Sequence, residues 1–204
     1  MEKKLLFTTI ILCFFSLQSF SQGFGGGLHV GLNASQVDGD AVQGFNKAGL
    51  SLGAFVNYEI GDNIFIQPEL LFEQLGSAFQ GITFVQTSHI TLPVVFKINI
   101  PVQMGNSTQA IQLHAGPAVG LLIGAKNDVG NDLSNLLKNF DTRIVGGLSY
   151  RLAPGFSFML RYGYSLGSFI ETTAPTAANL LAPGKTGLAH NYVNIGLRVH
   201  FTAN

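Results

Sequence analysis

Few combinations of side chains in this sequence could carry out chemistry, and each lacks a required partner. Gly184-Lys185-Thr186 resembles the end of a phosphate-binding loop, but Asn179 stands where that loop needs its earlier glycine. Asp128 and Asp132 flank Gly130, yet the other oxygen ligands of a calcium-binding loop are missing. No two histidines are spaced as metal ligands. The sequence therefore predicts neither a cofactor nor a metal site.

Ser88, His89 and His190 are the residues best suited to an enzyme. In a membrane protein, such a group could attack lipid, with the serine hydroxyl as the nucleophile and a histidine as its base. A serine–histidine hydrolase also needs a third group that orients the base, and no carboxylate stands beside these residues in the sequence. We therefore predict a protein without enzymatic activity, in which these residues have a structural or loop role. A rim lipid hydrolase is the alternative.

Ion pairing is the other chemistry that the side chains offer. Eight charged residues, three acidic and five basic, lie at the polar positions of segments that alternate between polar and apolar residues. They are Glu59, Glu69, Glu73, Lys97, Arg143, Arg151, Arg161 and Arg198.

The segments that carry these charges have an apolar residue at every second position. In the first segment, Leu28, Val30 and Leu32 alternate with polar residues and glycine. A period of two is typical of β-strands, and most of the segments approach the ~9–11 residues of a tilted membrane strand. The segments are 28–35, 50–60, 64–73, 90–99, 111–123, 143–152, 156–166 and 193–201.

Short and long connections alternate between these segments. The short or moderate ones are 61–63, 101–107 and 153–155, and the long ones are 36–47, 77–87, 125–141 and 168–190. This alternation is typical of outer-membrane barrels, which have short periplasmic turns and longer outer loops. We therefore predict an all-β fold, an eight-stranded antiparallel up-and-down transmembrane β-barrel.

The composition does not suit a surface in water. The chain has 204 residues, 47% of them apolar, and its 11 Lys+Arg balance its 11 Asp+Glu, so that 11% are charged and the net charge is zero. A soluble domain has about 25% charged residues. The neutral charge argues against a partner made of nucleic acid, and the apolar content argues against disorder.

Residues 1–21 have the layout of a secretory signal peptide. The basic start Glu2-Lys3-Lys4 precedes the apolar stretch 5–17, and small residues allow cleavage near Ser21. A membrane anchor helix is the weaker alternative, because the stretch is shorter than the ~20 residues that a span needs. We predict an outer-membrane β-barrel domain over 22–204 after export.

The distribution of charge indicates which face of the barrel meets lipid. Without Glu2, Lys3 and Lys4, nineteen of the charged residues remain: eleven lie in connections, Asp141 among them, eight on the polar strand face and none on the apolar face. A soluble lipocalin-like barrel, with its apolar face inside, would expose to water a strand wall with only those eight charges. We therefore predict that the apolar face points outward into lipid.

The interior of an eight-stranded barrel is just wide enough for side chains. Charges in such a tube need partners, so we expect the eight strand charges to form a network of salt bridges that plugs the lumen. A narrow, porin-like, anion-selective path is the alternative, and it would need arginines left unpaired along a continuous file of water.

Other features concern the surface and the outer loops. Asp132 could cap a short helix that carries Leu133, Leu136, Leu137 and Phe140 at helical spacing, so the connections 125–141 and 168–190 are candidates for contact with a protein partner. Packing of that helix on the barrel rim is the favoured interpretation. Aromatic residues near the strand ends could form girdles at the membrane interfaces or could simply pack; they are Tyr58, Phe72, Tyr150, Phe156, Tyr162, Tyr164 and Phe201.

Three prolines fall inside predicted strands. Pro68, Pro93 and Pro117 cannot donate hydrogen bonds to a neighbouring strand, so we expect bulges or local kinks there.

Several short motifs resemble the small outer-membrane β-barrel family often labelled PorT-like. They are Glu69–Phe72, Leu92–Lys97, Gly116–Gly120, Arg161–Tyr164 and Asn191–Phe201. The resemblance implies an eight-stranded barrel in contact with outer-membrane lipid and with the barrel-assembly machinery, and no established enzyme chemistry. Such barrels usually end at an aromatic residue, whereas Thr202-Ala203-Asn204 follow Phe201 here.

Overall fold

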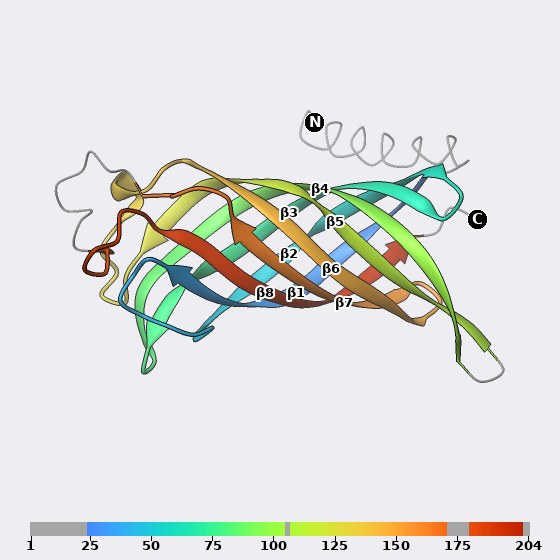
Figure 1. The fold of residues 1–204 in the computed structure, drawn as a ribbon, viewed down its shortest axis with the longest axis horizontal. Coiled ribbons are helices and arrows are strands. Elements are labelled where there is room, and N and C mark those ends of the chain that lie inside the picture. The colour runs from blue at the N-terminus through green and yellow to red at the C-terminus, as the bar shows by residue number, and fades with distance from the viewer. Residues whose placement is uncertain (1–23, 105–106, 171–179, 202–204) are drawn as a thin grey trace, which may run out of the picture.

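The chain forms a closed β-barrel (Figure 1). The computed structural model describes residues 24–104, 107–170 and 180–201, so the predicted signal peptide and residues 202–204 lie outside the described part. Each strand pairs antiparallel with its neighbours in the chain, and β8 pairs with β1 to close the barrel. The strands are β1 (Phe24–Asp38), β2 (Lys47–Gly61), β3 (Ile64–Phe79), β4 (Ile82–Met104), β5 (Ser107–Lys126), β6 (Phe140–Ala153), β7 (Phe156–Ser165) and β8 (Ala189–Phe201).

The barrel has two different ends. Short connections join β2 to β3, β4 to β5 and β6 to β7 at one end, which we call the turn end and which lies to the right in Figure 1. The connections 39–46 and 127–139 lie at the other end, together with the described parts of the β7–β8 connection, 166–170 and 180–188; we call it the loop end. In outer-membrane barrels short turns face the periplasm and longer loops face outward, so the turn end corresponds to the periplasmic end of such barrels.

The apolar face points outward, as the sequence predicts. Along β1, Leu28, Val30 and Leu32 are exposed, whereas His29 and Asn33 between and beyond them are buried. The same pattern continues around the barrel, where large apolar side chains of every strand are exposed. The described residues therefore form an apolar outer wall around an interior that combines polar and charged side chains with apolar ones such as Leu71, Val95 and Met159.

Strands β3 and β4 extend further than their apolar alternation indicates. The predicted loop 77–87 is wrong: strand pairing continues to a two-residue turn at Gln80 and Gly81, where φ is +50° and +85°. Glycine adopts such a conformation without steric cost. The alternation fades above Ile90 because the outward side chains Ser88 and Gln86 are polar, while backbone pairing does not depend on that polarity.

Of the bulges or local kinks predicted at the three prolines, the bulges are wrong, because the register does not shift there. At Pro68, Pro93 and Pro117 the ladder on one side of the strand skips two residue pairs and resumes in the same register. The ladder on the other side pairs the proline itself. A proline lacks one N–H, which faces one neighbour only, so a local gap in hydrogen bonding is sufficient. The register shifts lie instead at Glu59/Gly61, Ser77/Ala78, Ser88/His89 and Arg151/Ala153.

The connection between β5 and β6 contains less helix than the sequence predicts. A single turn of 3₁₀-helix, η2 (Ser134–Leu136), replaces the expected amphipathic helix. Asp132 accepts a hydrogen bond from the Ser134 amide at 2.8 Å. The Ser134 hydroxyl and, to a smaller extent, this amide lower the pKa of Asp132. Among the described residues, no helix is long and apolar enough to cross a membrane.

Candidate functional site

The lumen holds a buried network of charged and polar side chains. Six of the eight predicted lumen charges are buried there: Glu69, Glu73, Lys97, Arg143, Arg161 and Arg198. Glu59 and Arg151 are exposed at the turn end instead, because they belong to the last three residues of β2 and of β6. Asp141, which the sequence places in a connection, is the second residue of β6 and is buried in the lumen.

In the half of the network nearer the turn end, the Glu69 carboxylate is the shared hydrogen-bond acceptor. Arg161 donates to both oxygens of Glu69, at 2.7 and 2.8 Å, and Arg198 donates to Oε1 at 2.8 Å. Gln67 also donates to Oε1 through its amide nitrogen. Its amide oxygen accepts from Lys97 at 3.2 Å. We call these five residues the turn-side layer.

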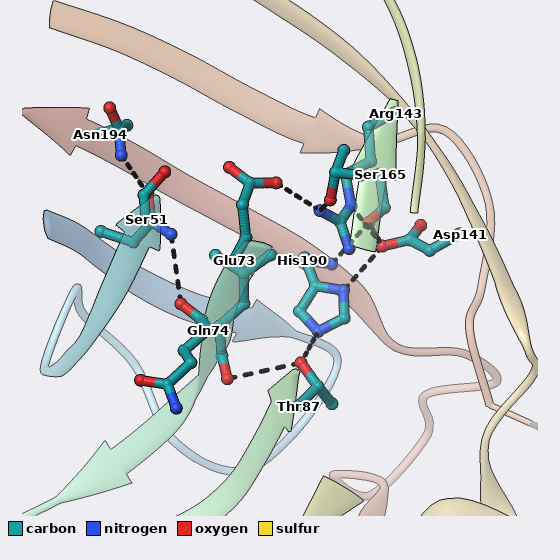
Figure 2. Close-up of polar contacts among 12 residues, drawn as sticks. Ser51, Glu73, Gln74, Thr87, Asp141, Arg143, Ser165, His190 and Asn194 are labelled. Atoms are coloured by element: carbon teal, nitrogen blue, oxygen red, sulfur yellow. Dashed lines mark hydrogen bonds and ion pairs between the residues drawn. The ribbon is translucent and has the colours of Figure 1, made fainter. Parts of the chain in front are cut away.

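A second group lies nearer the loop end (Figure 2). Arg143 donates to Asp141 at 2.7 Å and to Glu73 at 3.2 Å. The Ser165 hydroxyl donates to the same Asp141 oxygen at 2.9 Å. His190 Nδ1 lies 2.8 Å from that oxygen, and so donates to it. We call Glu73, Thr87, Asp141, Arg143, Ser165 and His190 the loop-side layer.

The loop-side layer contains the hydrogen-bond order of a nucleophile, a base and an orienting acid. His190 Nδ1 contacts Asp141, and its Nε2 lies 3.0 Å from the Thr87 hydroxyl. Thr87 and His190 are both completely buried, and the Phe169 ring stacks on the imidazole with ring centroids 3.9 Å apart. A hydrolase must expose its nucleophile to substrate. In this structure the three side chains link β4, β6 and β8 through buried hydrogen bonds.

The predicted Ser88–His89–His190 group is only partly assembled. The rings of His89 and His190 meet edge to face, with centroids 5.2 Å apart, but Ser88 lies on the opposite, outward side of β4. His89, Asp141 and His190 also bring possible metal-ligand atoms within 4.8 Å of one another. The Asp141 oxygen nearest His190 already accepts three hydrogen bonds, including one from Arg143, and a nearby guanidinium opposes a cation.

An apolar cluster lies above the loop-side layer, at the loop end of the lumen. Loop residues Leu137, Phe169 and Ile170 pack against inward residues of the barrel. Lys138 N–H donates to the Phe169 carbonyl at 2.7 Å and ties the two loops together, next to a β-bridge between Leu137 and Ile170. We call the cluster the cap; its buried members are Val37, Val85, Ala125, Leu137, Phe169, Ile170 and Leu188.

A polar cavity of about 430 Å³ opens at the turn end. Lys97 reaches it from the lumen, and Arg151 and Glu59 stand at its mouth. Amide side chains of Asn57 and Asn99 also line it. Sequence reasoning missed this cavity, because its lining comes from seven different strands, and no single segment shows how those strands are staggered.

The loop end carries an apolar groove of about 530 Å³ outside the cap. The β3–β4 turn supplies Phe79 and Ile82, and the β5–β6 connection supplies Val129, which is 84% exposed. On the neighbouring β1–β2 connection, burial raises the pKa of Asp40, although the Val42 amide donates to its carboxylate at 2.9 Å. We call this region the loop-end groove.

The predicted girdle residues differ in exposure. Tyr58, Phe156, Tyr162 and Phe201 are exposed on the outer wall. Phe72, Tyr150 and Tyr164 are half-buried. Their role at a membrane interface stays a prediction.

Comparison with known proteins relates this barrel to the outer membrane. A family model described as "Outer membrane protein beta-barrel domain" matches residues 17–171. No curated protein sequence matches the chain.

Several solved structures are similar at low sequence identity. Ail, the attachment invasion locus protein of Yersinia pestis, is 13% identical over 88% of this chain and 100% of its own, with a TM-score of 0.46. Neisserial surface protein A is 13% identical over 88% of this chain and 98% of its own, with a TM-score of 0.48. OprG from Pseudomonas aeruginosa is 15% identical over 90% of this chain and 98% of its own, with a TM-score of 0.37.

Proposed function

The chain belongs to the outer membrane protein beta-barrel domain family, and from this premise we propose that it is a plugged surface barrel that presents its loop end to a protein partner. The observation that carries the proposal is the filling of the lumen by two layers of ion pairs and an apolar cap. The protein is an integral outer-membrane barrel and its outer wall meets lipid. Within the family, the motifs support the narrower PorT-like group, and we propose folding by the barrel-assembly machinery after removal of residues 1–21.

The proposal includes no enzymatic activity. Among the described residues, the nucleophile–base–acid arrangement of Thr87, His190 and Asp141 is buried under Phe169, so that lipid at the surface cannot reach it. The loop end carries an exposed apolar surface, in which Phe79 is 58% exposed and Ile82 is 63% exposed. Exposed apolar patches beyond the lipid band are typical of protein contact sites.

The lumen is expected to conduct no ions. Purified protein in planar bilayers should give no single-channel steps, because the ion pairs of both layers and the cap leave no continuous file of water. The double variant Phe169→Ser and Ile170→Ser should also stay closed, since it removes part of the cap and leaves both layers in place. Steady anion-selective currents through the unaltered protein would replace the plug with the porin-like alternative.

The loop-end groove is expected to determine partner binding. Cross-linking in intact outer membranes should give a defined protein adduct, and Ile82→Asp with Val129→Asp should reduce its yield at least about tenfold, because a charge placed in an apolar contact must be desolvated. Lys185→Asp is the control: Lys185 is exposed at the loop end outside the groove, so the yield should stay unchanged. An adduct that survives the groove variant would exclude this surface as the contact.

A further inference from the structure

The turn-side layer has an imbalance of charge. Its one carboxylate, Glu69, faces the three basic side chains Lys97, Arg161 and Arg198, all of them buried. The carboxylate is occupied: its oxygens accept two bonds from Arg161 and one from Arg198, besides the bond from Gln67. In the loop-side layer, where the two carboxylates outnumber the one guanidinium, Glu73 is already bound to Arg143. Positive charge is therefore in excess toward the turn end.

Lys97 carries the part of this excess that a ligand can reach. Its ammonium group donates to Asn57 at 2.9 Å and to Gln67 at 3.2 Å, both neutral amide oxygens. An ammonium group has three donors, so one donor has no hydrogen-bond acceptor among the described residues, where the Phe65 ring centroid lies 5.2 Å from the nitrogen. Lys97 is 4% exposed, yet it lines the turn-end cavity. A buried cation without a counter-ion is costly, and an anion that entered the cavity would supply one.

The lining of the cavity suits a small organic anion. Arg151 adds a second positive charge at the mouth, against the single carboxylate of Glu59. Side-chain amides of Asn57, Asn99 and Gln112 offer further donors, while aromatic rings form part of the wall. The volume of about 430 Å³ lies within the usual range of small-molecule sites, about 300–1,000 Å³.

We propose that the turn-end cavity is a binding site for a small organic anion of the carboxylate or phosphate class, held by Lys97 and Arg151. Gln67 connects Lys97 to Glu69, so the ion pairs of Arg161 and Arg198 with that carboxylate lie on the lumen side of the site. The pocket opens toward the periplasmic end, so it is independent of any partner at the loop end. Binding here without conductance separates this proposal from the porin-like alternative.

The test is a titration of the full-length mature protein, refolded in lipid nanodiscs, followed by nuclear magnetic resonance. Sodium phosphate and sodium succinate are the two probes, each added at constant ionic strength. We expect saturable shifts of the side-chain amide signals of Asn57, Asn99 and Gln112. Saturation by phosphate alone assigns the phosphate class, and saturation by succinate alone assigns the carboxylate class. Shifts that fail to saturate with both probes would overturn the proposal.

Variants connect the binding to the cavity. Lys97→Gln should weaken the affinity about 10–100-fold, because it removes a charge-assisted hydrogen bond. Arg151→Gln, at an exposed position that folding tolerates, should weaken it about three- to tenfold. Lys185→Gln removes the same charge at the loop end and should leave the affinity unchanged. Heat-modifiable gel mobility checks that each variant is folded, and equal affinities in all folded variants would overturn the assignment to this cavity.

Discussion

Replacing Glu69 by glutamine is expected to lower the free energy of unfolding by about 3–5 kcal/mol, the usual effect of removing one partner from a buried ion pair. The loss should be large because this carboxylate is 3% exposed and is shared by Arg161 and Arg198. Glutamine retains the shape and one acceptor oxygen, but it leaves two guanidinium groups buried without a negative charge. Urea titration of the protein refolded in lipid vesicles measures the change.

Glu59→Gln is the matched control for this prediction. Glu59 is the same residue type on the neighbouring strand β2, but it is exposed at the turn end. Surface substitutions of this kind usually change stability by less than about 0.5 kcal/mol. If Glu69→Gln lowered the free energy of unfolding as little as Glu59→Gln does, the turn-side layer would not stabilise the barrel.

The two layers illustrate which parts of the site the sequence can predict. The face of a residue follows from the period of two, because a strand between lipid and lumen must place apolar side chains on one side and polar ones on the other. Glu69, Arg161 and Arg198 are assigned to the lumen in this way. Their mutual contact, between residues up to 129 positions apart, depends on strand tilt and stagger. Those quantities are properties of the closed barrel, and no single segment contains them.

Errors in the prediction lie where lipid no longer constrains the sequence. The strands β3 and β4 continue to the turn at Gln80–Gly81, above the apolar band, so alternation alone ends them too early. Asp141 is assigned to a connection for the same reason, although it points into the lumen beside Arg143. A signal was available, since Asp141 and Arg143 are two residues apart and so share one face of a strand.

The cap could be predicted in composition but not in position. Leu137 and its neighbours stand out as apolar residues in a connection, and helical spacing was the only pattern available to interpret them. Their actual partners are Phe169 and Ile170 from the β7–β8 connection and inward residues of the barrel rim. The apolar side chains of the connection are buried against the barrel rim and the β7–β8 connection, so their burial does not require an amphipathic helix.

Leu197→Arg is expected to lower the free energy of unfolding in lipid by about 2–4 kcal/mol, the usual effect of a basic residue on the lipid face at the bilayer midplane. Leu197 lies on the outward face of β8 between Ile195 and Val199, is 49% exposed and pairs with the equally exposed Val30 of β1. An arginine there cannot turn into the lumen without reversing the alternation of the strand. Urea titration in lipid vesicles again gives the change.

Depth is the decisive control for this second prediction. Phe201→Arg makes a comparable change on the same outward face of β8, four residues nearer the turn end. At the membrane interface a basic side chain costs about 0–1 kcal/mol, and its long stem can reach the headgroups. A large loss at Leu197 with a small one at Phe201 requires a solvent that changes from apolar to polar along the strand. Equal losses would instead fit a wall in one uniform solvent, and the outward apolar band would then have to be covered by protein rather than by lipid.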